Sequence, residues 1–200
     1  MAAPTPADAP WLRPVPEAAT LRGALARAVP VIETERLRLR APRVEDWPAL
    51  EESWTSARAV YLGGPFTPEE GWSDFCRMVA GWLLRGVGYF TVERRESGEV
   101  LGFVGINHDW GDAELEEGWQ VTAEAEGKGY ATEAARAVRD WAFTTLGLRG
   151  FVSYVDPANA RSQALARRIG GVLDPEAPLT GPNDDGHTIV FRHRAEGIAR

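Results

Sequence analysis

Residues 126–133 have the sequence EGKGYATE, and a strongly helical run, AARAVRDWAF, begins directly after it at Ala134. Two glycines, Gly127 and Gly129, flank Lys128 at the start of this run. Glycine weakens a helix interior but adopts left-handed backbone conformations easily. Its position here indicates either a sharp turn or a group that comes very close to the backbone, and the choice decides how the whole chain is interpreted.

Two ordinary explanations come first. The stretch can be plain punctuation, a loop rich in Glu and Gly that enters a helix. It can also be a dinucleotide-binding turn, because Gly127, Gly129 and Thr132 give GxGxxT, and Asp156 ends a predicted strand 27 residues after Gly129. The third glycine of that motif is missing, however. Several antiparallel strands are also predicted before the turn, where a dinucleotide-binding unit would open a parallel sheet.

The third explanation is a phosphate site at a helix N-terminus. The first four N–H groups of a helix have no partner inside it, and with the helix dipole they attract anions. Gly127 and Gly129 carry no side chain that would keep a diphosphate away from successive amides. Lys128 either adds positive charge or points to water. From the residues alone, all three explanations stay open.

Periodicity predicts the remaining elements. Leu37 and Leu39 alternate with arginines, which predicts a half-exposed strand, and Thr67 followed by Pro68 predicts a helix start. The predicted strands are 34–40, 89–95, 100–108, 113–121, 151–155, 171–173 and 187–194; the predicted helices are 44–54, 67–86, 130–146 and 159–169. The short connections favour antiparallel hairpins. Antiparallel strands with helices before and after them predict an α/β (α+β) fold, not a regularly alternating doubly wound sheet.

Composition limits the classes of partner. The chain has 200 residues, a formal net charge of −7 and 44% hydrophobic residues, which predicts one globular domain. No basic stripe is present, so we predict no nucleic-acid partner and consider a basic or amine-bearing substrate compatible with the charge. The N-terminus lacks an apolar signal region and no run approaches the ~20 apolar residues of a membrane span. We therefore expect a cytoplasmic protein without a membrane partner.

The N-terminal segment and the single cysteine give two further expectations. Residues 1–30 are rich in Ala and Pro and are predicted to form an arm with a short helix at 17–28; residues 31–200 form the domain. Trp11 and Leu12 are the expected contacts if the arm docks. Cys76 lies among apolar residues of a predicted helix and is expected to be a buried thiol. No Cys/His cluster is present, so we predict no metal site.

A family resemblance favours the phosphate site. The segment EEGWQVTAEAEGKGYATEAARAVRDWAF resembles the acyl-CoA loop of the GNAT N-acetyltransferases, especially their RimJ/RimL-like branch. Four further segments resemble family elements in the same order: TERLRLRAPRVEDWPAL, LGFVGI, FVSYVDPANARSQALARRIGG and HTIVFRHR. Together they cover roughly residues 31–194. The resemblance implies a mixed, mostly antiparallel sheet of about seven strands, splayed between the fourth strand at 113–121 and the fifth at 151–156, with about four helices.

The resemblance also implies a site for acetyl-CoA. The pantetheine arm would lie between the splayed strands and pair with the backbone of Val121, and the turn at 124–129 would hold the pyrophosphate. Thr132 and Asn159 can each serve as helix caps instead of, or as well as, ligands. The cofactor-binding residues so implied are Val121, Glu124, Glu126, Gly127, Lys128, Gly129, Tyr130, Ala131, Thr132, Asn159 and Ser162.

The implied catalytic residues are Glu116 and Ser162. Glu116 matches the family's fourth-strand glutamate, which accepts the amine proton; strand alternation puts its neighbour Glu117 on the opposite face, and Glu117 is the alternative base. Many family members have a tyrosine as acid at the position of Ala166. Its absence makes Ser162 the candidate substitute, although a solvated serine is the ordinary reading.

The resemblance implies an N-acetyltransferase that moves the acetyl group of acetyl-CoA to a primary amine, on a protein N-terminus or a small molecule, by direct attack. Dimers are common in that branch, so a homodimer is expected. His108 and Asp109, at the end of the third long strand, are candidates to line the acceptor side. Two other functions compete: a non-catalytic acyl-CoA-binding module of the same fold, and a nicotinamide or flavin oxidoreductase.

Overall fold

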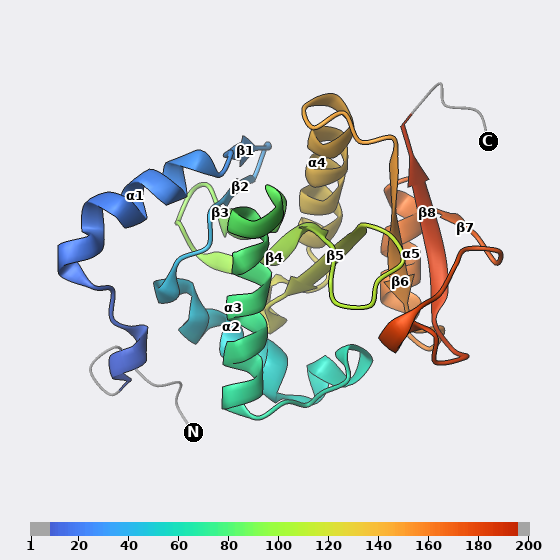
Figure 1. Cartoon of the computed structure of the whole chain (residues 1–200), viewed down its shortest axis with the longest axis horizontal. Coiled ribbons are helices and arrows are strands. Elements are labelled where there is room, and N and C mark those ends of the chain that lie inside the picture. Colours follow the sequence, from blue (N-terminus) through green and yellow to red (C-terminus); the bar gives the residue numbers. More distant parts are fainter. Residues whose placement is uncertain (1–8, 196–200) are drawn as a thin grey trace.

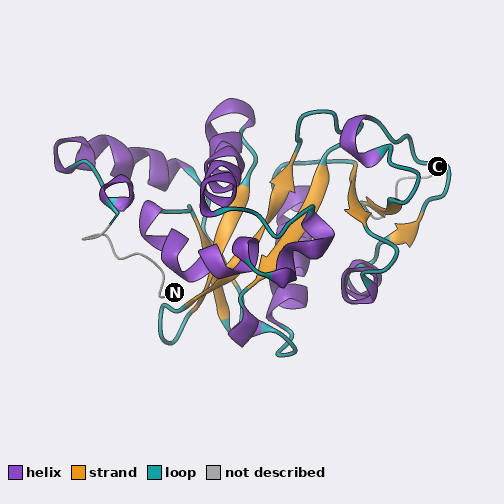
Figure 2. Cartoon of the chain, turned by 90° about the horizontal axis from the view of Figure 1, so that it is seen from below, coloured by secondary structure: helices purple, strands orange, loops and turns teal. Residues whose placement is uncertain are grey.

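The computed structural model describes residues 9–195, which form one mixed sheet with helices on both sides (Figures 1 and 2). The helices are α1 (Ala19–Ala28), α2 (Trp47–Thr55), α3 (Pro68–Arg85), α4 (Tyr130–Thr144) and α5 (Ala160–Arg168). The strands are β1 (Ile32–Glu33), β2 (Leu37–Arg40), β3 (Tyr89–Arg94), β4 (Val100–Asn107), β5 (Glu116–Val121), β6 (Gly150–Val155), β7 (Val172–Leu173) and β8 (Ile189–Arg194). Short 3-10 turns lie between them, including Ala57–Leu62 after α2.

The strand order is β1-β2-β3-β4-β5-β6-β8-β7, and every neighbouring pair is antiparallel except β5 and β6. This confirms the predicted mixed, mostly antiparallel sheet. The described part of the sheet has eight strands rather than about seven, because the short β1 adds an edge strand beside β2. Within residues 9–195, no helix is both long and apolar enough to cross a membrane.

Both faces of the sheet are buried. On one face, α2 and α3 contribute Trp47, Leu50, Trp54 and Phe75 to a cluster that includes Phe103 of β4. On the other face, small residues of α4 pack against the sheet in a second cluster; among its members are Ala134, Ala135, Val138, Val104 and Ile106. Because both faces carry helices, β4 is apolar along nearly its whole length, and a strand alternating with solvent is not seen there.

Four expectations need correction. β5 begins at Glu116, not at 113, because residues 109–112 turn back on themselves through an Asp112 N–H to Asp109 carbonyl bond. Arg40 does not face solvent: it is 7% exposed and makes two hydrogen bonds with the Asp46 carboxylate. Cys76 is exposed, since its neighbour Phe75 occupies the buried position on α3.

The fourth correction concerns the arm. Leu12 is fully buried in the α2–α3 cluster, whereas Trp11 is 60% exposed and is not the contact we expected. A 3-10 turn at Pro10–Leu12 sets these two side chains in different directions. Further along, Arg22 of α1 makes an ion pair with Glu45 before α2. We propose that the arm predicted for residues 1–30, of which residues 1–8 lie outside the described part of the chain, docks through Leu12, and that 31–200 form the domain.

This proposal gives a stability test. Replacing Leu12 by Ala should lower the free energy of unfolding by about 2–5 kcal/mol, because it opens a cavity in a packed cluster. Replacing the neighbouring Trp11 by Ala should change it by less than about 0.5 kcal/mol. Urea unfolding followed by tryptophan fluorescence and far-UV circular dichroism measures both. Equal, small effects would mean that the arm does not contribute to the fold.

Candidate functional site

The site begins where two strands separate. β5 and β6 are parallel and share one register pair, Glu116 with Val152. The Val152 N–H donates to the Leu115 carbonyl at 2.9 Å. Beyond this point no further pair joins the two strands within the described residues, and a groove of about 1830 Å³ runs between them and the start of α4.

The open edge of β5 presents backbone polar groups to this groove. The Thr122 N–H donates to the Leu101 carbonyl at 2.8 Å. In an antiparallel ladder the residues alternate between facing the partner strand and facing away. The N–H and C=O groups of Trp119 and Val121 therefore point away from β4 and toward β6. The Val121 carbonyl accepts a hydrogen bond from the Arg58 guanidinium at 2.8 Å, so only the N–H of Val121 remains open to a ligand.

The EGKGYATE stretch forms both a sharp turn and an open row of amides. Gly127 and Gly129 have φ values of 71° and 81°, and Gly129 is the N-cap of α4, which has no side-chain cap. The hydroxyl of Thr132 is therefore not the cap. Among residues 9–195, the backbone N–H groups of residues 127–132 donate no hydrogen bond. Alternating left- and right-handed backbone with free N–H groups is the geometry that binds anions.

Arg36 and Glu133 hold this turn in place. Arg36 donates to the Lys128 carbonyl at 3.0 Å and makes an ion pair with Glu133 of α4 at 2.7 Å. The second Glu133 oxygen accepts a bond from the Thr34 hydroxyl at 2.6 Å. Arg36 thus holds the Lys128 carbonyl on one side of the turn. The neighbouring backbone N–H groups remain unpaired within the described part of the chain and can face the groove. The Lys128 side chain itself is exposed.

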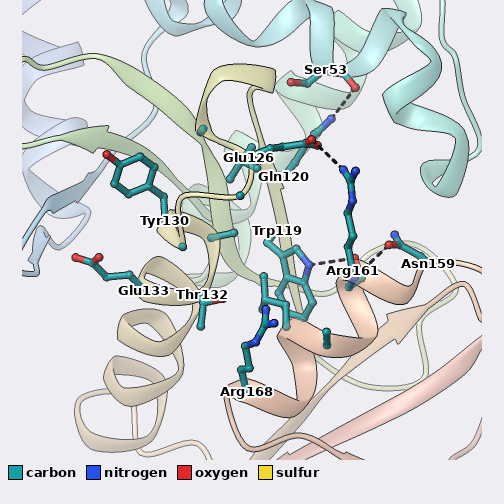
Figure 3. Close-up of a pocket in the computed structure, with 18 of the residues that line it drawn as sticks. Ser53, Trp119, Gln120, Glu126, Tyr130, Thr132, Glu133, Asn159, Arg161 and Arg168 are labelled. Carbon is teal, nitrogen blue, oxygen red and sulfur yellow. Dashed lines mark hydrogen bonds and ion pairs between the residues drawn. The ribbon is translucent and has the colours of Figure 1, made fainter.

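The opposite wall comes from α5 (Figure 3). Asn159 is the N-cap, and its side-chain oxygen accepts a hydrogen bond from the Ser162 N–H at 3.1 Å. The Ser162 hydroxyl accepts a hydrogen bond from the Trp119 indole N–H at 3.3 Å, so its own hydrogen remains available for another acceptor. Ala166 lies one turn further on, is fully buried and offers no polar group.

The rim of the groove is rich in arginine although the chain is acidic overall. Glu126, in the turn, makes ion pairs with Arg58 at 2.8 Å and with Arg161 at 2.9 Å (Figure 3). Further arginines line the groove: Arg36, Arg136 and Arg168. A ligand with several negative charges therefore matches this surface better than a neutral one. Neither Arg58 nor Arg36 was found from the sequence, because their partners lie far along the chain and no local pattern marks them.

Glu116 and Glu117 lie on opposite faces of β5, as alternation predicted. Glu116 is half-buried on the face of α3; burial, together with the charges of Asp112 and Asp109, raises its pKa to about 8. Glu117 is completely buried on the α4 side, where neither carboxylate oxygen has a hydrogen-bond partner among the described residues. Burial holds its pKa well above the ordinary value, partly opposed by Arg139. Of the two, Glu116 is the one that keeps a partly exposed surface.

The chain is similar to known acetyltransferases in both sequence and structure. Residues 36–172 match the family model described as acetyltransferase (GNAT) domain. An acetyltransferase crystal structure from Agrobacterium tumefaciens is 43% identical with a TM-score of 0.78, covering 84% of this chain and 95% of that one. The uncharacterized N-acetyltransferase p20 of Bacillus licheniformis is 32% identical over 140 residues, 68% of this chain and 79% of its own. A RimL ribosomal L7/L12 acetyltransferase in complex with coenzyme A shares the fold at 18% identity, with a TM-score of 0.65 and coverage of 82% and 98%.

The burial of Glu117 gives a prediction about stability and pH. The pKa of Glu117 is higher in the folded protein than in the unfolded chain, where it is about 4.5. As the pH rises above 4.5, the unfolded chain loses this proton while the folded protein keeps it, so the free energy of unfolding falls. Gln at this position stays neutral. Glu117→Gln should therefore melt at a higher temperature than the unmodified chain, with a gap that widens with pH to about 3 °C or more. Thermal unfolding across a pH series measures it.

The matched control is Glu96→Gln, which changes an exposed glutamate in the β3–β4 turn. Its melting temperature should follow that of the unmodified chain at every pH. A melting temperature of Glu117→Gln that falls below that of the unmodified chain at alkaline pH would contradict the buried, unpaired state of this carboxyl group.

Proposed function

The chain belongs to the GNAT acetyltransferase family, and from this premise we propose that it transfers the acetyl group of acetyl-CoA to a primary amine, on a protein N-terminus or a small molecule. The family uses acetyl-CoA, and its members are named as acetyltransferases. The observation that carries the proposal is the run of unpaired N–H groups at residues 127–132, placed at the start of α4 beside the groove between β5 and β6.

The residues of the groove fit the co-substrate. Its diphosphate matches the open amides of residues 127–132 and the basic rim, since a helix N-terminus binds phosphate oxygens without further side chains. Glu124 and Glu126 belong to the same turn, and Tyr130, Ala131 and Thr132 to the first turn of the helix. The Val121 N–H would donate to the pantetheine arm, which would lie beside β5 like an added strand. The Val121 carbonyl is already hydrogen-bonded to Arg58. Asn159 and Ser162 would contact the arm from α5.

Glu116 acts as the base in this proposal. Acetyl-CoA supplies a thioester carbonyl, and the amine nitrogen bonds to the carbonyl carbon as the carbon–sulfur bond breaks. The nitrogen must lose its extra proton, and Glu116 accepts it, directly or through water. Its raised pKa suits this role, because a base with a pKa near 8 still receives a proton from an ammonium group while being ionised in mildly alkaline solution.

Ser162 takes the place of the missing tyrosine. The leaving sulfur carries negative charge, and the free hydrogen of the Ser162 hydroxyl can bond to it. A thiolate is a good leaving group, so a hydrogen bond from serine suffices where a stronger acid is absent. The sequence features and the RimJ/RimL-like relatives also lead us to propose a cytoplasmic location and a homodimer. A non-catalytic acyl-CoA-binding module is the competing function, since Ala166 offers no acid.

A glycine pair tests the phosphate site. Gly127 and Gly98 both have φ near 71–72°, and a methyl group at either would meet no atom within 4 Å. Replacement by Ala should therefore lower stability similarly in both, by about 1 kcal/mol. Only Gly127→Ala places the methyl beside the open amides, and it should weaken coenzyme A binding about tenfold or more. Isothermal titration calorimetry with coenzyme A measures this; equal affinities in the two variants would count against the site.

A pH profile tests the base. Acetyl transfer, followed by thiol release with a panel of small amines and N-terminal peptides, should give a kcat/KM that rises with pH and levels off above about 8, the pKa of Glu116. Glu116→Gln should lower kcat by about 100-fold or more and remove this rise, while coenzyme A still binds. Binding of coenzyme A without transfer to any amine would favour the non-catalytic module.

A further inference from the structure

Tyr89 of β3 reaches across the sheet to β5 through two glycines. Tyr89 is paired with Gly105 of β4, and Gly105 is paired with Gly118 of β5, so the three residues lie side by side on the same face. A Cβ atom at Gly118 would lie 2.2 Å from the Tyr89 hydroxyl oxygen, and one at Gly105 would lie 2.4 Å from the Tyr89 Cα. Neither glycine has a positive φ. Their lack of a side chain therefore provides space, which is filled at Gly105 by the backbone of Gly88 and Tyr89 and at Gly118 by the Tyr89 phenol.

The phenol hydroxyl ends beside the proposed base. Gly118 is two residues from Glu116 on the same strand, so both face α3. The charged groups around the hydroxyl are Glu116 of β5, Asp109 after β4, and Asp74 and Arg77 of α3, with Arg77 paired to both aspartates. Burial raises the pKa of Tyr89 well above its ordinary value, and the charge of Glu116 raises it further, so the hydroxyl stays protonated.

The hydrogen bonding of Tyr89 differs from that of a side chain that serves only the core. Tyr89 is a partly exposed residue, and within residues 9–195 its hydroxyl makes no hydrogen bond, so its donor hydrogen and acceptor lone pairs are available to a ligand. Trp82, by contrast, donates its indole N–H to the Tyr89 carbonyl at 2.7 Å and so uses its polar group inside the protein. A ring that served packing alone would not need a hydroxyl at this position, where Phe would fit with less crowding at Gly118.

We propose that the Tyr89 hydroxyl contacts the acceptor amine and orients it for attack. The phenol oxygen accepts one N–H of the amine, the one that remains in the amide product, while Glu116 accepts the proton that the nitrogen loses. Hydrogen bonds to both Tyr89 and Glu116 fix the orientation of the amine and so the direction of its lone pair. With Glu116 alone, the amine could still rotate. This inference rests on the proposed acetyl transfer and adds a catalytic residue on the acceptor side, separate from the coenzyme groove.

The test uses Tyr89→Phe, Gly118→Ala and the double variant. Tyr89→Phe keeps the ring and removes the hydroxyl; kcat/KM for the amine should fall about tenfold, the size of effect expected for one lost hydrogen bond, while KM for acetyl-CoA stays unchanged. Gly118→Ala forces its new methyl group onto the hydroxyl, so both melting temperature and amine kcat/KM should fall. In the double variant the hydroxyl is gone, so the melting temperature should recover most of its loss, but the amine kcat/KM should not.

The outcomes separate the two proposals. If the unmodified chain acetylates amines and Tyr89→Phe retains kcat/KM for the amine within about twofold, the role of Tyr89 is wrong and the acetyl transfer stands. Recovery of both stability and activity in the double variant would likewise show that Tyr89 only packs. If the unmodified chain acetylates no amine of the panel, the proposed function and the role of Tyr89 fail together.

Discussion

One parallel contact sets the geometry of the site: the pairing of β5 with β6 at Glu116 and Val152. β6 pairs with β8 along its whole length, from Gly150 to Val155, so its direction is fixed by that neighbour rather than by β5. After the shared point, side chains replace the ladder between the strands: the Ser153 hydroxyl donates to the Glu117 carbonyl at 2.8 Å. The open β5 edge, the groove and the proposed base at Glu116 all follow from this separation.

Charge divides the region into two unlike parts. The groove beside α4 carries arginines on its rim, two of them held by Glu126. The face toward α3 carries Asp109 and Asp112, whose charges raise the pKa of Glu116, and also Asp74 near Tyr89; Arg77, a cation on this face, lowers the Glu116 pKa. A polyanionic co-substrate and a cationic amine would thus be attracted to different ends of the same strand, the first near Val121 and the second near Glu116. β5 lies between them, which is where a bond between the two substrates has to form.

The sequence predicted the features that local patterns determine and missed those that depend on distant partners. The start of α4, the glycine turn and the Asn159 cap were found because each is written in a few neighbouring residues. The burial of Arg40 was missed because it depends on Asp46 after the strand and on Glu93 in β3. Arg58 was missed because its partner, Val121, lies 63 residues away. The role of Gly105 and Gly118 could not be predicted from the sequence. Neither has a positive φ, and what distinguishes them is the crowding by Tyr89, which only the folded structure shows.

Ala166, at the position where the family resemblance led us to expect a tyrosine, is tightly enclosed. Ala166 lies in a small buried cluster with Val155 and Phe191, and the Trp119 ring packs against this cluster. A larger side chain at 166 would need this cluster to rearrange, because packed interiors leave little spare volume. The same indole donates its N–H to Ser162, one helical turn before Ala166. One bulky side chain on β5 therefore packs against the cluster that encloses Ala166 and also holds the hydroxyl of Ser162.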